Sequence, residues 1–105
     1  MSPEKLLHLL VIERSSHVVT ASGGKDEVWV EIARTRAELA EGGMTEAQGE
    51  SGTVSTEAYT FRARWTPGIT LADRVIHDGR TFDIIGLAEI GRRSALEIRL
   101  RRTGP

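Results

Sequence analysis

The sequence of 105 residues has no cysteine, so disulfide bonds and thiolate metal sites are excluded. The same absence is compatible with a reducing compartment. Long apolar runs are lacking too, because the run at 6–12, LLHLLVI, is too short to span a bilayer. Glu13 and Arg14 follow it directly, where a secretory signal would have small residues at a cleavage site. We therefore expect a protein made in the cytosol that has no membrane partner.

A strong net charge is also lacking, since 14 basic and 15 acidic residues give a formal charge of −1. This excludes a polycation built to bind nucleic acid. The charges are unevenly distributed along the chain, however. Acids alone occur from Glu38 to Glu57, and from Arg92 onward five arginines accompany a single acid, Glu97. Two interpretations remain open: two solvated surfaces, or a molecule with one acidic and one basic end that suits stacking against other subunits.

Residue patterns for catalysis or metal binding are missing. His8, His17 and His77 have none of the spacings of metal sites, and His77, next to Asp78, is expected to be a solvated histidine beside a turn. The segment 49–52, GESG, is not the turn that presents a nucleophilic serine. Gly23-Gly24-Lys25 lacks the spacing of a phosphate-binding loop. We expect no enzyme activity, no metal and no cofactor.

Alternating and β-branched residues predict strands along most of the chain. The expected strands cover 6–13, 27–40, 58–65, 74–77, 80–86 and 95–102. For 6–13 a short helix is the alternative, and for 31–41 a helix competes because the helix propensities are good. Between Ile32 and Ala33 the apolar row moves by one position, as a β-bulge would require. The prediction is one all-β domain over 1–105, a small antiparallel barrel or sandwich of about six strands.

The segment 58–65 alternates most clearly. Tyr59, Phe61, Ala63 and Trp65 should face the core, with Arg62 and Arg64 among the residues on the other face. A barrel that stacks nucleic-acid bases on its aromatic residues is an alternative, but alternation puts arginines and aromatics on opposite faces. Asp78-Gly79 predicts a two-residue hairpin, and turns are expected at Gly23-Gly24, Pro67-Gly68 and 91–93.

The segment 41–56, EGGMTEAQGESGTVST, has four glycines and only Met44 and Val54 as larger apolar residues. It cannot bury enough apolar surface to order itself, and loops of this length in small domains are usually functional or disordered. We expect a long flexible loop between the second and third main strands. A floppy hairpin tip is the alternative.

The stretch from 64 to 84, RWTPGIT followed by DRVIHDGRTFDI, resembles the RYRPGVT…MRVVYDGRVFDI stretch of phage head–tail joining proteins. These are also called head-completion or stopper proteins and have relatives in gene transfer agents. The likeness continues in order through LLVIER at 9–14, EVWVEIARTRA at 27–37 and RRSALEIRLRR at 92–102. It covers nearly the whole chain with similar spacings.

The resemblance implies a small β-barrel that forms a homo-oligomeric ring, sixfold or twelvefold, between the portal or adaptor and the tail-terminator or tail-tube protein. It implies a place at the head–tail interface of a virion or phage-like particle assembled in the bacterial cytoplasm. Packaged double-stranded DNA would pass the channel without sequence specificity, and the ring would help to retain it. A small barrel that binds nucleic acid or peptide is the alternative.

The resemblance also implies site residues. The loop would project toward the channel and act as its gate, and its glutamates would repel DNA phosphates; the residues concerned are Glu41, Gly42, Gly43, Met44, Thr45, Glu46, Gln48, Gly49, Glu50, Ser51 and Gly52. Arginines would form the contacts with neighbouring subunits or partners, namely Arg62, Arg64, Arg92, Arg93, Arg99, Arg101 and Arg102. Lys5 and Arg14 are further candidates for docking.

Overall fold

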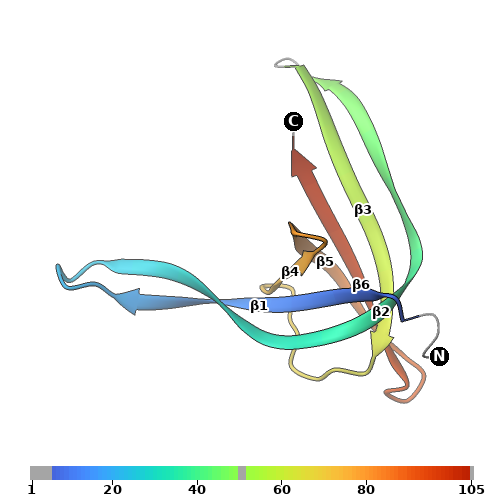
Figure 1. Cartoon of the computed structure of the whole chain (residues 1–105), viewed down its shortest axis with the longest axis horizontal. Helices are drawn as coiled ribbons and strands as arrows, with labels where there is room; N and C mark the ends of the chain where they lie inside the picture. Colours follow the sequence, from blue (N-terminus) through green and yellow to red (C-terminus); the bar gives the residue numbers. More distant parts are fainter. Residues whose placement is uncertain (1–5, 50–51, 105) are drawn as a thin grey trace.

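The computed structural model describes residues 6–49 and 52–104 and consists of one sheet of antiparallel strands (Figure 1). The sheet closes on itself in the order β1-β2-β3-β6-β5-β4. The strands are β1 (His8–Val19), β2 (Lys25–Gly49), β3 (Gly52–Arg64), β4 (Arg74–His77), β5 (Arg80–Ile90) and β6 (Ala95–Gly104). The all-β prediction with about six antiparallel strands is confirmed, and the helices considered for 6–13 and 31–41 do not form.

Alternation and bulges explain how these strands curl. Leu10 and Ile12 of β1 point inward and are fully buried. In the β1–β2 pairing, Ile12 lies opposite Ala33 and Glu13 opposite Glu31, so Ile32 is an extra residue. This is the predicted bulge, and it allows both apolar rows of β2 to lie on one side of the sheet. Two further bulges, at Ala40 and Ile85, were not predicted.

The core lies inside the closed part of the sheet. Phe61 of β3 is completely buried, and Tyr59 and Trp65 pack partly buried against the same cluster. The arginines between them, Arg62 and Arg64, are exposed. The two faces predicted for this strand are confirmed, and no aromatic row is left on the outer face of β3 for stacking bases. The core cluster consists of Leu10, Ile12, Ala37, Phe61, Ala63, Val75, Phe82, Ile84, Leu96, Ile98 and Leu100.

The tight turns use the residues that their backbone angles demand. Asp78 and Gly79 have φ angles of 52° and 75°, as a type I′ hairpin requires, and join β4 to β5. Gly68 has a φ angle of 87° after Pro67, where a side chain would be strained. The predicted hairpin and the Pro-Gly turn are both confirmed.

Two ribbons of paired strand extend beyond the closed sheet in different directions (Figure 1). One is the outer part of the β1–β2 pair, and the other is the β2–β3 hairpin. They make the molecule extended, with principal extents of 50 × 37 × 21 Å. Its radius of gyration is 15.9 Å, against about 13 Å for a compact domain of this length.

The β2–β3 hairpin corrects the prediction of a long loop at 41–56. Strands β2 and β3 stay paired from Ala37 opposite Ala63 out to Gly49 opposite Gly52. Composition was misleading because it measures only the apolar surface that side chains can bury. Here the backbone groups of the two segments satisfy each other, and the pairing continues outward from a register already set inside the core.

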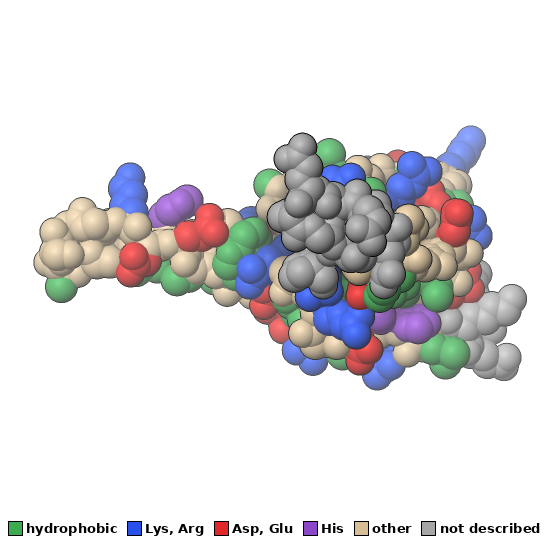
Figure 2. Space-filling view, turned by 90° about the horizontal axis from the view of Figure 1, so that it is seen from above, with side chains coloured by type: hydrophobic (Ala, Val, Ile, Leu, Met, Phe, Trp, Pro, Cys, Tyr) green, Lys and Arg blue, Asp and Glu red, His purple; other side chains and the backbone are tan. Residues whose placement is uncertain are grey.

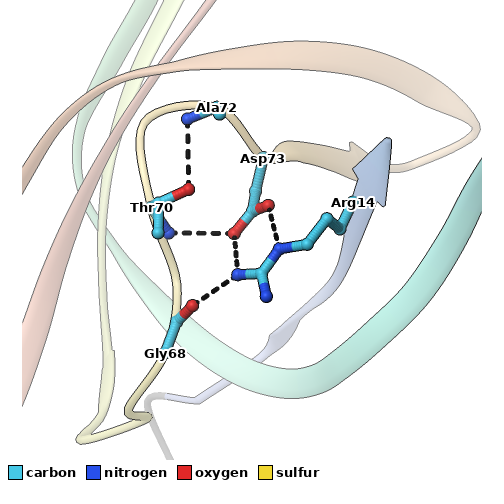
Figure 3. Close-up of polar contacts among 5 residues, drawn as sticks. All are labelled: Arg14, Gly68, Thr70, Ala72 and Asp73. Atoms are coloured by element: carbon cyan, nitrogen blue, oxygen red, sulfur yellow. Dashed lines mark hydrogen bonds and ion pairs between the residues drawn. The ribbon is translucent and has the colours of Figure 1, made fainter. Parts of the chain in front are cut away.

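A partly buried ion pair fixes the connection between β3 and β4 to strand β1 (Figure 3). The guanidinium of Arg14 donates to both carboxylate oxygens of Asp73 at 2.9 Å and to the carbonyl of Gly68. The Thr70 amide also donates to Asp73, whose side chain is completely buried. Asp73 is therefore a turn former, as its sequence context indicates. Arg14, a docking candidate in the sequence, forms this ion pair within the fold, and Lys5 lies outside the described residues.

Candidate functional site

The predicted gate residues lie on the β2–β3 hairpin. Glu41 lies opposite Thr60, and the exposed residues from Glu41 to Thr45 continue the strand toward the tip. The last described pair is Gly49 with Gly52, so Glu50 and Ser51 of the predicted gate lie outside the described residues. The hairpin therefore presents a projecting two-stranded ribbon where the sequence predicted a loop.

The two neighbouring glycines at the base of this hairpin differ in what surrounds them. A Cβ atom on Gly42 would collide with the ring of Tyr59, its register partner on β3. A Cβ atom on Gly43 would meet nothing within 4 Å. Gly42 therefore allows the Tyr59 ring to lie against the backbone of β2, where the hairpin leaves the core. An open hollow of about 550 Å³ lies beside this point and is lined in part by Met44, Thr60 and Arg99.

A buried carboxylate at the base of the hairpin was missed by sequence reasoning. Glu57 is only 3% exposed, and its Oε1 atom lies 2.6 Å from Arg80 and 3.7 Å from Arg102. Its Oε2 atom has no hydrogen-bond partner in the part of the chain that the structure describes. The alternation of β3 places Glu57 on the same face as Tyr59 and Phe61, which was the available signal. Glu57 therefore connects β3 to β5 through its ion pair with Arg80 and to β6 through its ion pair with Arg102.

The arginines proposed as an interface do not form one basic end. Arg62 lies between Glu38 on β2 and Glu97 on β6 in the strand register. Arg101 likewise lies opposite Asp83 of β5. Figure 2 shows basic and acidic side chains interspersed on the face that it draws. Antiparallel pairing brings the acidic and basic segments of the sequence side by side, so the interpretation of two oppositely charged ends is wrong.

The remaining arginines are divided between two ends of the sheet. Arg102 points toward Glu57, away from the outer face that Arg99 and Arg101 share. Arg92 and Arg93 lie in the β5–β6 turn, at the end of the sheet where Arg64 pairs with Ala95. There the Arg93 guanidinium lies 5.7 Å from the centre of the Trp65 ring. Ala58, opposite Arg101, and Arg64 are six residues apart on β3, which corresponds to about 20 Å.

Two histidines meet at the edge of the core. The Nε2 atom of His77 lies 3.3 Å from Nδ1 of His8, and the Phe61 ring is 5.0 Å from His77 between ring centres. Burial lowers the pKa of His77, the charges of His8 and Arg80 lower it further, and Asp78 acts in the opposite direction. The expectation of a solvated histidine is therefore wrong, because β1 and β4 are neighbours and bring together residues 69 positions apart.

The comparisons with known proteins place this geometry in a family. The model of the family described as phage head completion protein matches residues 1–103. The chain belongs to this family. It is therefore a structural protein of a virion or phage-like particle, with a role in joining head and tail. No curated protein matches the sequence.

Solved structures share the fold of this head completion protein. A chain of the virion of a native gene transfer agent particle is 26% identical with a TM-score of 0.68, over 91% of this chain and 93% of that one. A Shigella flexneri 2a protein solved in solution is 18% identical with a TM-score of 0.67, over 97% and 96%. The xkdH protein of the phage-like element PBSX of Bacillus subtilis is 13% identical with a TM-score of 0.55, over 90% and 92%. The last two show the fold alone.

Among residues 6–49 and 52–104 of this head completion protein, no group of three or more histidines and acids is placed to hold a metal ion. No helix in the described part of the chain is long and apolar enough to cross a membrane. What the described part of the chain offers is a projecting ribbon, mixed surface charge and two buried carboxylates, Asp73 and Glu57, that pair with half-exposed arginines.

The His8–His77 pair predicts a stability that depends on pH. Their hydrogen bond needs one neutral acceptor nitrogen, and the lowered pKa of His77 means that the unfolded chain binds protons more readily. This contribution to stability is complete above the usual histidine pKa of about 6.5 and is lost as the pH falls through the lower pKa of the folded state. We expect the Tm to fall by roughly a few degrees from pH 7.5 to 5.5, and His77→Phe to reduce this fall.

The control for this measurement is His17→Gln, because His17 is exposed on the β1–β2 ribbon. That variant should keep the pH dependence of the original chain. If His77→Phe and His17→Gln show the same dependence on pH, the histidine pair does not stabilise the fold in the neutral form.

Proposed function

We propose that this head completion protein is a stopper: residues 1–105 act as one head–tail joining domain whose copies form a ring between the portal or adaptor of a DNA-filled capsid and the tail. The ring helps to retain DNA and to dock the tail, as a structural and not a catalytic part. The observation that carries this is the family match over 1–103 together with the likeness to a chain of a gene transfer agent virion.

The β2–β3 hairpin is the element that we assign to the channel. It extends from the closed sheet as a narrow ribbon, a shape that reaches into a channel without needing a core of its own (Figure 1). The charge expected to repel DNA comes from Glu41, Glu46 and Glu50, because Glu57 is buried against Arg80 and Arg102. The buried Glu57 instead holds the base of the hairpin to β5 and β6.

The register determines how the hairpin should be shortened. Removing 43–52 alone would join Gly42 to Thr53 and leave 53–58 as a loop between Gly42 and Tyr59, so Glu57 would lose its register partner Met44. Replacing 45–56 by Asn-Gly instead links Met44 to Glu57, which are register partners, through a two-residue turn. Glu57, Gly42 and Tyr59 then keep their contacts, so the chain should fold.

We expect particles with the shortened hairpin to lose packaged DNA or to remain without tails, because the channel is no longer closed. Nuclease sensitivity of the packaged DNA and electron microscopy of the particles measure this. A full-length control with Glu41, Glu46 and Glu50 changed to Gln separates charge from length. Particles with the shortened hairpin that retain DNA fully and carry tails normally would contradict the assignment of the hairpin to the channel.

A further inference from the structure

The outer part of the β1–β2 pair, which we call the arm, consists of residues 15–31. Its strands pair only with each other among the described residues, because β4 reaches β1 only from Val11 to Glu13 and β3 reaches β2 only from Ala37 onward. The arm therefore has two free strand edges and lies outside the core (Figure 2). An isolated two-stranded ribbon is marginally stable in water, so an arm of this kind gains from being covered.

One face of the arm carries three exposed valines. Val18 lies opposite Asp26, and Ser16 lies opposite Val28, so Val18, Val28 and Val30 share a face. These valines are 50%, 37% and 51% exposed, respectively. Val19, which is 69% exposed, lies on the other face with Lys25 as its register partner. Exposed valines on the face of a ribbon whose edges are also unpaired form a typical docking surface.

A second apolar surface lies at the other end of β1. Leu7, Leu9, Val11 and Ile76 line a groove between β1 and β4 on the outside of the closed sheet. Leu7 is 73% exposed and Leu9 is 36% exposed. Val11 is paired directly with Ile76, so the groove floor is continuous across the seam between the two strands.

The arm of a chain cannot reach the groove of the same chain. Leu9 and Val18 are nine residues apart on one extended strand, or about 30 Å, and they lie on opposite faces of it. Two surfaces at opposite ends and on opposite faces of one extended strand can only meet between copies. Such head-to-tail contacts form closed rings when the rotation between copies closes.

The charges at the two surfaces also match. Asp26 lies on the valine face, as the register partner of Val18, whereas Lys25 lies on the other face of the arm. The groove has exposed Arg36 on one side, as the register partner of Leu9, and Asp78 in its lining on the other. The one acid on the docking face, Asp26, therefore has an opposite charge, Arg36, beside the groove, which favours this pairing.

We propose that the arm of one chain docks with its valine face in the Leu7–Ile76 groove of a second copy, and that this contact joins neighbouring subunits. That the assembly is a connector ring rests on the function proposed above. The docking of the arm in the groove of a second copy does not depend on that function. The occupant of the groove is thus a second copy of this chain.

Cysteine cross-linking tests the contact directly, because the chain has no cysteine of its own. Particles made with a mixture of Val28→Cys and Leu9→Cys chains should give a disulfide-linked dimer on oxidation, and chains carrying both changes should give a ladder. A control mixture of Val28→Cys with Leu71→Cys, a loop residue that is 61% exposed, should give none. Absence of the Val28–Leu9 dimer from assembled particles would overturn the proposal.

Val18 and Val19 are neighbours on opposite faces of the arm, so variants at these two positions form a matched pair for an assembly assay. Val18→Lys puts a charge on the docking face and should reduce incorporation into particles roughly tenfold or more, while Val19→Asp on the opposite face should leave it nearly unchanged. Each new charge lies opposite a residue of the other sign, Asp26 and Lys25 respectively, so neither variant weakens the arm by repulsion. Both residues are exposed in the monomer, so both variants should keep the Tm of the original chain. Equal incorporation of the two variants would contradict the proposal.

The outcomes separate this contact from the function proposed for the ring. If the cross-linked ladder forms but particles with the shortened hairpin retain DNA and tails, the contact stands and the channel role fails. If the shortened hairpin causes DNA loss but Val18→Lys assembles normally, the channel role stands and the contact fails. Loss of incorporation with Val18→Lys without any Val28–Leu9 dimer would mean that the arm docks on a different virion protein, which also refutes the proposal.

Discussion

Replacing Phe61 by Ala should lower the free energy of unfolding by about 3–5 kcal/mol, because a large, completely buried ring is removed and leaves a cavity. Phe61 lies in the middle of the core between Leu39 of β2 and Ile98 of β6, and its ring is also close to those of His8, Tyr59 and His77. A domain of this size is typically stable by only about 5–15 kcal/mol. We therefore expect the Tm to fall by about 12 °C or more, measured by circular dichroism.

Two variants bracket this result. Phe61→Leu keeps most of the apolar volume and should cost clearly less than Phe61→Ala. Val19→Ala, at an exposed position on the arm, should change stability by less than about 0.5 kcal/mol. A Phe61→Ala chain as stable as Val19→Ala would show that the core is not centred on this ring.

The second large effect concerns Asp73. Replacing it by Ala removes three hydrogen bonds to a completely buried carboxylate and should cost about 2–3 kcal/mol. The loss is smaller than for a fully buried pair, because Arg14 is about half exposed and remains hydrated. Urea unfolding measures the difference, and Asp83→Ala, at an exposed acid on β5, is the control.

The Asp73 effect should also depend on pH. The hydrogen bonds from Arg14 hold the pKa of Asp73 below its usual value, so the unfolded chain takes up the proton first as the pH falls. The stabilisation is complete above the usual pKa of about 4 and is lost below it, as the pH passes through the lower pKa of the folded state. The difference between the original chain and Asp73→Ala should therefore shrink below pH 4. A difference that does not change with pH would show that the ion pair is not its source.

Sequence patterns over a few residues predicted the parts of the fold that depend on neighbouring residues, such as strand faces, turns and a bulge. The alternation of Tyr59, Phe61 and Ala63 identified the core face of β3, and Asp78-Gly79 identified the β4–β5 hairpin. The shift of the apolar row after Ile32 identified a bulge that the strand register confirms. The family was also recognised from the sequence, through its ordered set of short motifs.

What the sequence did not predict depends on pairings between distant residues. The Arg14–Asp73 and His8–His77 contacts join positions 59 and 69 apart, and nothing in the neighbourhood of either residue marks its partner. The β2–β3 hairpin was mistaken for a loop because its stability comes from backbone pairing begun at Ala37 and Ala63. Arg102 was grouped with Arg99 and Arg101, although it faces Glu57 on the other side of the strand.

The seam between β1 and β4 has a consequence for how the chain folds. The hairpins of this protein join neighbours in sequence, and such ribbons form within about 1–10 microseconds. The seam instead has only three register pairs, Val11 with Ile76, Ile12 with Val75 and Glu13 with Arg74, and each brings together residues more than sixty positions apart. Closing the sheet at this seam therefore requires the most distant strand pairing among the described residues and gains the fewest register pairs. A sheet left open there would present the β1 and β4 edges for pairing with another copy.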